Sequence, residues 1–156
     1  VPAYLSLGTA YFYKKRAYSA AATYYNKAVE LAESAQLHNY LGMAYNQQGL
    51  YGQAVNEYRK AIELDPDYAP AHMNLGITYY YMKKINDSIN MQKKAISLNP
   101  NNPDAYFFIA QGYDKAQQNQ EAIRYYRQFI AMTLGQDRYN GYADTAKQRI
   151  AALGGG

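Results

Sequence analysis

The strongest constraint on the fold is a repeat of 34 residues in the middle of the sequence. Residues 35–68 and residues 69–102 align without a gap, and apolar, small and proline positions recur together. A fixed period of this length is typical of stacked supersecondary units, because a single unit cannot bury its apolar face alone. The residues of the first copy that recur 34 positions later are Leu41, Gly42, Tyr45, Ala61, Ile62, Leu64 and Pro66.

Each copy contains two helical patterns separated by a short turn. Gly49 is expected to end the first helix, and Pro66 follows the second. The small residues Gly42, Ala54 and Ala61 allow the two helices to approach closely. This pattern resembles the tetratricopeptide repeat (TPR), whose period is also 34 residues. The next copy carries it in Leu75, Gly76, Tyr79, Ala95 and Pro100, with Ser88 and Gln92 in place of a small and an aromatic residue.

The resemblance implies an all-α fold, a right-handed superhelical solenoid of four TPR helix pairs plus a C-terminal capping helix. We expect one domain over residues 1–156, with repeats at about 1–34, 35–68, 69–102 and 103–136. In the first repeat the second helix begins one residue late, so we place an extra residue in the loop at 14–18.

The capping helix is expected at about residues 138–153, followed by a flexible glycine tail at 154–156. Asp137 would cap its first turn. An apolar stripe at helical spacing predicts that one face of this helix is buried. The stripe consists of Tyr142, Ala146, Ile150 and Leu153.

The composition argues against a catalytic or metal site. The sequence has no cysteine and two histidines, and His38 and His72 both occupy a core-facing position of their repeats. Neither a glycine-rich phosphate loop nor a nucleophile–base arrangement is evident. We therefore predict no enzyme activity, cofactor or metal and, since no apolar run reaches 18 residues, no membrane span. The net charge of +4 does not by itself indicate nucleic acid, and the lack of cysteine fits cytoplasm and periplasm equally.

The resemblance also implies a concave groove lined by the first helix of each pair. Aromatic residues and methionines at these positions would form an apolar surface for a partner segment. Asparagine and glutamine could hydrogen-bond its main chain, because an amide both donates and accepts. Alternatively, these side chains pack on one another and belong to the core. The predicted groove residues are Leu5, Thr9, Phe12, Tyr13, Asn39, Met43, Asn46, Gln47, Met73, Ile77, Tyr80, Tyr81, Phe107 and Gln111.

The function that we expect is a protein-interaction scaffold that binds an apolar or aromatic peptide segment. The alternatives are a substrate-recruiting region of a larger enzyme such as a glycosyltransferase, and a small-ligand carrier lined by tyrosines. The family's clamp for an acidic C-terminus is absent, since its five positions hold other residues. These are Leu5, Thr9, Tyr40, Pro70 and Asn74.

Two further expectations concern partners. Basic residues near the turns offer an alternative site for an acidic partner or an anionic surface. They are Lys14, Lys15, Arg16, Lys83, Lys84 and Lys115. No polar helix precedes Val1 and the sequence begins without Met, so we also expect upstream repeats or head-to-tail self-association.

Overall fold

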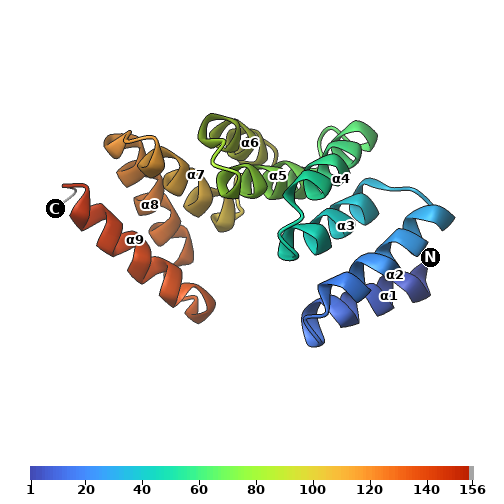
Figure 1. The fold of residues 1–156 in the computed structure, drawn as a ribbon. Helices are drawn as coiled ribbons and strands as arrows, with labels where there is room; N and C mark the ends of the chain where they lie inside the picture. Colours follow the sequence, from blue (N-terminus) through green and yellow to red (C-terminus); the bar gives the residue numbers. More distant parts are fainter. Residues whose placement is uncertain (155–156) are drawn as a thin grey trace. The chain divides into compact units, whose positions relative to one another are not determined.

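The computed structural model describes residues 1–154, and over this range the chain forms nine α-helices and no strand (Figure 1). These helices form four consecutive pairs and a final single helix, which confirms the predicted all-α fold. The pairs are α1 (Pro2–Thr9) with α2 (Tyr18–Leu31), α3 (Ala35–Gln47) with α4 (Tyr51–Leu64), α5 (Ala69–Tyr81) with α6 (Ile85–Leu98), and α7 (Pro103–Lys115) with α8 (Asn119–Thr133). The final helix is α9 (Asn140–Ala152). Most of the predicted glycine tail lies outside the described residues.

The chain divides into two compact units, an N-terminal unit of residues 1–78 and a C-terminal unit from Tyr79 onward. The boundary falls within α5. Each unit has a core of its own, so the two are described separately below. The expectation of one domain over residues 1–156 stays a prediction.

The extra residue of the first repeat lies in a π-helical turn at Ala10–Lys14, not in the loop where we expected it. The backbone N–H of Lys15 donates to the carbonyl of Ala10, five residues back, at 3.3 Å. Such a turn inserts one residue into a helix and shifts the register of everything after it. Phe12 is therefore 8% exposed, close to the 7% of Tyr79 and Tyr113, which stand at position 11 of the third and fourth repeats.

The contact that joins α3 to α4 in the N-terminal unit is a glycine against a tyrosine ring. A Cβ atom added to Gly42 would lie 2.7 Å from Cε1 of Tyr58, and the Tyr58 side chain is only 1% exposed. Gly8 stands in the same relation to Tyr25, at 2.6 Å. The small residues of the repeat thus make room for a large ring on the partner helix, as the pattern predicted.

The core of the C-terminal unit is built from α7, α8 and α9. Ile109, Tyr126 and Phe129 are fully buried at its centre, and Ile150 of α9 packs on the same cluster. Leu153 contacts this cluster while remaining partly exposed. The predicted capping helix therefore covers α8 with its apolar face.

Two details of the final helix differ from the prediction. Asp137 is not its cap, because a short 3₁₀ turn (Asp137–Tyr139) precedes α9 and no side chain caps its first turn. Tyr142 is about half exposed, although the stripe placed it on the buried face. Its ring lies edge-on against Phe107, with centroids 5.1 Å apart.

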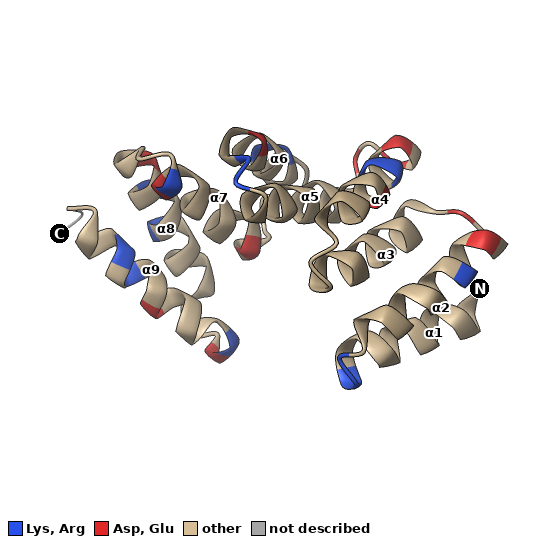
Figure 2. Cartoon of the chain, in the orientation of Figure 1, with Lys and Arg blue, Asp and Glu red and all other residues tan. Residues whose placement is uncertain are grey.

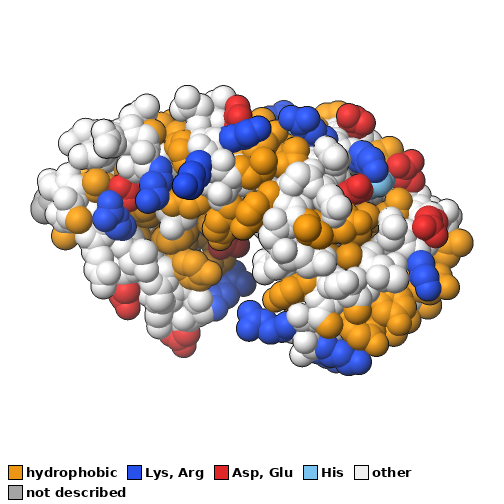
Figure 3. Space-filling model, viewed as in Figure 1, with side chains coloured by type: hydrophobic (Ala, Val, Ile, Leu, Met, Phe, Trp, Pro, Cys, Tyr) orange, Lys and Arg blue, Asp and Glu red, His pale blue; other side chains and the backbone are white. Residues whose placement is uncertain are grey.

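Charged residues lie in the turns and along several helices, whereas α1, α3 and α5 contain no lysine, arginine, aspartate or glutamate (Figure 2). Basic residues mark the turn between α1 and α2 and the turn between α5 and α6 (Figure 2). Hydrophobic side chains, a class that includes tyrosine, reach the surface in several patches (Figure 3). No helix in the described range is both long and apolar enough to cross a membrane.

Candidate functional site

In the N-terminal unit, two amide side chains of the predicted groove, on α3, accept hydrogen bonds from polar side chains of α5. The Asn74 side-chain amide donates to Oδ1 of Asn39 at 2.9 Å, and the Thr78 hydroxyl donates to Oδ1 of Asn46 at 3.2 Å. Asn39 is buried. These bonds link α3 to α5, so the Asn39 and Asn46 carbonyl oxygens are already engaged within the unit.

A cavity of about 360 Å³ opens on α1 and the π-helical turn. Tyr13 lines it and is 59% exposed, whereas its neighbour Phe12 is buried. The Thr9 hydroxyl donates to the Leu5 carbonyl at 2.8 Å, so it is tied to its own helix. The full lining is Leu5, Ser6, Thr9, Ala10, Tyr13 and Lys14.

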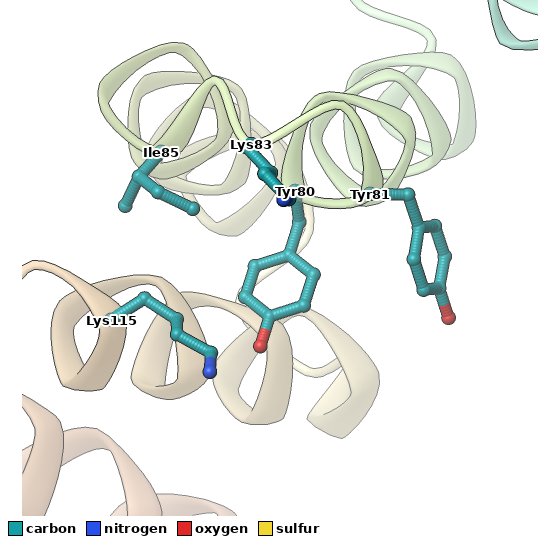
Figure 4. Close-up of a pocket in the computed structure, with 5 residues that line it drawn as sticks. All are labelled: Tyr80, Tyr81, Lys83, Ile85 and Lys115. Atoms are coloured by element: carbon teal, nitrogen blue, oxygen red, sulfur yellow. The ribbon is translucent and has the colours of Figure 1, made fainter.

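The C-terminal unit holds a larger cavity, of about 520 Å³, lined by Tyr80, Tyr81, Lys83, Ile85 and Lys115 (Figure 4). The end of α5, the following turn and the last residue of α7 supply the tyrosines and the lysines. Figure 4 shows Tyr80 extending on the side of Lys115, whereas Tyr81 points away from it. Tyr80 is thus the central aromatic wall, and Tyr81, 52% exposed, forms the rim.

A second cavity of about 260 Å³ shares Tyr80 and Lys115 with the first. Its floor contains a bidentate ion pair, in which Arg149 donates to Asp114 at 2.7 and 2.8 Å. The Tyr126 hydroxyl also donates to Asp114, at 3.4 Å. The remaining lining residues are Gln111 and Thr145.

The tyrosines of this second cavity remain neutral in the folded chain. Burial raises the pKa of Tyr126 far above its ordinary value, and the Asp114 carboxylate raises it further. The same two causes, in the same order, raise the pKa of Tyr80. A neutral phenol can donate a hydrogen bond, so Tyr80 presents both a ring face and a donor.

The fourteen predicted groove residues fall into three groups. Phe12, Asn39 and Phe107 are buried and belong to the core, which corrects the prediction for these three. Phe107 is enclosed by Phe129 and Tyr142, whose ring centroids each lie 5.1 Å away. The exposed residues are Tyr13, Gln47 and Tyr81, and the partly exposed ones are Leu5, Thr9, Met43, Asn46, Met73, Ile77, Tyr80 and Gln111.

Four charged residues that line the two cavities of the C-terminal unit were not among the fourteen predicted groove residues, although Lys83 and Lys115 were among the basic residues of the predicted alternative site. Lys115 and Asp114 stand at groove positions of the fourth repeat, so the repeat pattern could have included them. Lys83 lies in a turn, where the repeat pattern assigns no groove residue. Arg149 comes from the capping helix, 35 residues beyond its partner, and no local signal in the sequence pairs the two.

The two histidines are buried and make different contacts. His38 lies between two carboxylates, with Nδ1 2.6 Å from Glu57 and Nε2 2.9 Å from Glu33. Nε2 of His72 lies 2.8 Å from the carbonyl oxygen of Pro66. Over residues 1–154, no group of three potential ligands is arranged to hold a metal ion.

Comparisons with known families match most of the sequence. A family model described as "TPR repeat" matches residues 42–83, and one described as "Tetratricopeptide repeat" matches residues 1–34 and 69–102. A third, also described as "Tetratricopeptide repeat", matches residues 105–138. A search of curated proteins gives no match.

Solved structures show the same fold at low sequence identity. A crystal structure of MamA is 24% identical and superimposes with a TM-score of 0.74, covering 94% of this chain and 92% of that one. The TPR domain of Arabidopsis OM64 is 20% identical, with a TM-score of 0.70 over 77% of this chain and 96% of that one. The first TPR of Spaghetti (RPAP3), solved with the HSP90 peptide SRMEEVD, is 22% identical, with a TM-score of 0.68 over 77% and 95%.

Proposed function

Because this chain belongs to the tetratricopeptide repeat family, we propose that it is a protein-interaction scaffold that binds an apolar or aromatic segment of a partner protein. The observation that carries the proposal is the position of Tyr80, which lines two adjoining cavities in the C-terminal unit. Aromatic side chains at the wall of a cavity are frequent anchors of binding energy. RPAP3, which shares the fold, is recorded with a bound peptide.

Apolar surface adjoins this tyrosine on one side, in the larger cavity. Ile85 lines the same cavity, and the Tyr81 ring lies edge-on to Tyr80 with centroids 6.0 Å apart. An apolar or aromatic side chain of a partner would lie against Tyr80 and Ile85. Burial of such a side chain contributes about 1.5–3 kcal/mol.

Gln111 is the amide best placed to bind the main chain of such a segment. It lines the cavity of about 260 Å³ and is partly exposed, unlike the buried Asn39. A glutamine amide can donate to a peptide carbonyl and accept from a peptide N–H. In the C-terminal unit, Gln111 would therefore hydrogen-bond the main chain of the partner segment, as the sequence suggested for Asn39 and Asn46.

The N-terminal unit offers a second contact region of similar character. Tyr13 and Leu5 line the cavity of about 360 Å³, and Met43 is partly exposed in the same unit. Methionine adapts to side chains of varied shape, and tyrosine provides a rigid amphipathic face. A partner with two apolar segments could therefore contact both units.

The test is a peptide selection on the full chain followed by affinity measurement. Random peptides displayed on phage are selected against the protein, and the enriched peptides are measured by calorimetry with the native chain and with Tyr80→Ala/Tyr81→Ala. We expect enrichment of aromatic and aliphatic residues. The double variant should lose about tenfold or more in affinity while its melting temperature stays within a few degrees.

Lys84→Ala is the matched control, because Lys84 lies in the same turn but does not line the cavity. It should bind the selected peptides as the native chain does. Unchanged affinity of a folded tyrosine variant would show that these tyrosines are not binding anchors. Unfolding of the variant with unchanged affinity per folded molecule would show that they are core residues.

A further inference from the structure

Two lysines on the wall of the larger cavity have no anionic partner. Lys83 and Lys115 both line it, both are exposed, and neither makes an ion pair among the residues that the structure describes. Other lysines of the chain do have one, such as Lys60 with Glu57 at 3.1 Å and Lys147 with Asp144 at 3.4 Å. The positive charges of the two ammonium groups at this cavity are therefore not compensated by an ion pair.

The acidic side chain of the adjoining cavity does not compensate these charges. Asp114 borders the adjoining cavity, but both of its oxygens accept hydrogen bonds from Arg149. This bidentate geometry matches one carboxylate to one guanidinium and neutralises both. The two cavities taken together therefore carry an excess of two positive charges, from Lys83 and Lys115.

The backbone holds Lys83 in a fixed place. Its N–H donates to the Tyr80 carbonyl at 3.0 Å, and the N–H of Lys84 donates to the Tyr79 carbonyl at 2.9 Å. These two bonds close the turn after α5, with Lys83 in the left-handed region at φ 62°. Lys115 is the last residue of α7, and Figure 4 shows its side chain running toward the hydroxyl end of Tyr80.

We propose that this cavity binds the side-chain carboxylate of an aspartate or glutamate that adjoins the apolar residue captured by Tyr80. The proposal rests on the proposed function and adds the charge of the partner segment to it. Lys83 and Lys115 would each donate to the carboxylate, and the Tyr80 hydroxyl would supply a third donor. The preferred segment is then apolar and acidic at once, which the repeat pattern alone did not indicate.

The carboxylate belongs to a side chain rather than to a chain end because the site continues. The cavities of about 520 and 260 Å³ share Tyr80 and Lys115, so a segment in the first can run on into the second. The Gln111 amide in the second cavity would then bind main chain beyond the acidic residue. A terminal carboxylate would leave the second cavity unused.

Three N-acetylated peptides, two of them also amidated, test this on the full chain by following amide chemical shifts in NMR titrations. They are acetyl-Phe-Glu-Leu-amide, acetyl-Phe-Gln-Leu-amide and acetyl-Phe-Gln-Leu with a free C-terminus. We expect the Glu peptide to bind about tenfold more tightly than either Gln peptide, equivalent to ~1.4 kcal/mol. High salt should remove most of this advantage, because the lysines are exposed and their charges are screened.

Two double variants, each lacking two positive charges, assign the effect to residues. Lys83→Gln/Lys115→Gln should abolish the preference for Glu over Gln while still binding both peptides. Lys84→Gln/Lys147→Gln, whose lysines lie in the same unit but outside the cavities, should keep the preference. Melting temperatures of both variants establish that they are folded.

The outcomes separate this inference from the proposed function. Equal binding of the Glu and Gln amides by the native chain would overturn the carboxylate site and leave the aromatic capture standing. If the peptide with a free C-terminus bound more tightly than the Gln amide, and the Glu amide did not, the assignment of the carboxylate to a side chain would be overturned. A preference that survives Lys83→Gln/Lys115→Gln would overturn the role of these lysines. If no peptide shifts the amide signals of Tyr80 or Tyr81, the proposed function itself fails.

Discussion

Replacement of Gly42 by alanine tests the packing of glycine against a tyrosine ring that the first and second repeats share. The added Cβ would lie 2.7, 2.8 and 3.0 Å from three ring atoms of Tyr58, nearer than such atoms normally approach. Tyr58 cannot easily move away, because its ring is fully buried and its hydroxyl is hydrogen-bonded to Thr78. The substitution must therefore displace α3, α4 or the ring.

The magnitude is the difference between two opposing effects. Overpacking of a well-filled core costs about 1–3 kcal/mol. Alanine gains up to about 1 kcal/mol over glycine from its higher helix propensity. The net loss should be about 1–2 kcal/mol, which lowers the melting temperature of a chain of this size by about 2–8 °C. Gly42→Leu adds three more carbons at the same point and should cost more.

Gly52→Ala is the matched control, because Gly52 lies in α4 and a Cβ there meets no atom within 4 Å. This substitution increases helix propensity without a steric clash, so it should raise the melting temperature slightly. The assay is thermal unfolding followed by circular dichroism, with Tyr58→Leu added to the Gly42→Ala chain. That double variant should recover part of the loss caused by Gly42→Ala alone. If Gly42→Ala were as stable as Gly52→Ala, the close approach of α3 and α4 would be wrong.

Two further predictions concern the tyrosines and the last helix. Burial raises the pKa of Tyr58 and of Tyr126 well above the ordinary 10.0, so their neutral forms stabilise the folded chain fully below pH 10 and this contribution is lost as the pH rises further. Helical circular dichroism should therefore fall together with, or before, the ionisation of these buried phenols in an absorbance titration; ionisation of all 20 tyrosines near pH 10 with the helices intact would contradict this. Ile150→Ala should destabilise the C-terminal unit by about 2–4 kcal/mol, because Ile150 is buried against α8 and its neighbours, whereas Lys147→Ala on the outer side of α9 should have almost no effect in urea unfolding. Equal unfolding midpoints for the two variants would show that α9 does not close the core.

The repeat pattern was sufficient to predict the helices but not their side-chain environment. The C-terminal ends of α3 and α4 follow from local signals, since Gly49 comes directly after α3 and its cap, and Pro66 comes shortly after α4. The burial of Ile150 follows from periodicity in the same way. These features depend on residues within about one turn of each other, which a sequence displays directly.

The errors arose where distant residues decide the outcome. Phe107 occupies a groove position, but Tyr142 of the capping helix covers it from 35 residues away. The pairing of Asp114 with Arg149 spans the same separation. Phe12 was predicted to line the groove for another reason. One extra residue can be accommodated by a π-helical turn or by a longer loop, and the sequence pattern is the same in both cases. Only the hydrogen bond from Lys15 to Ala10 distinguishes them.

The bonds between Asn39 and Asn74 and between Asn46 and Thr78 give the repeats a fixed order. The apolar frame is nearly the same in the second and third repeats, so it would accept either one in either place. The polar pairs are not interchangeable: a tandem copy of the second repeat would place tyrosine and alanine where Asn74 and Thr78 now stand. Buried Asn39 would then lose its partner, at a cost of about 1–3 kcal/mol. The second and third repeats thus share an apolar frame but differ in their polar contacts, which match the second repeat specifically to the third.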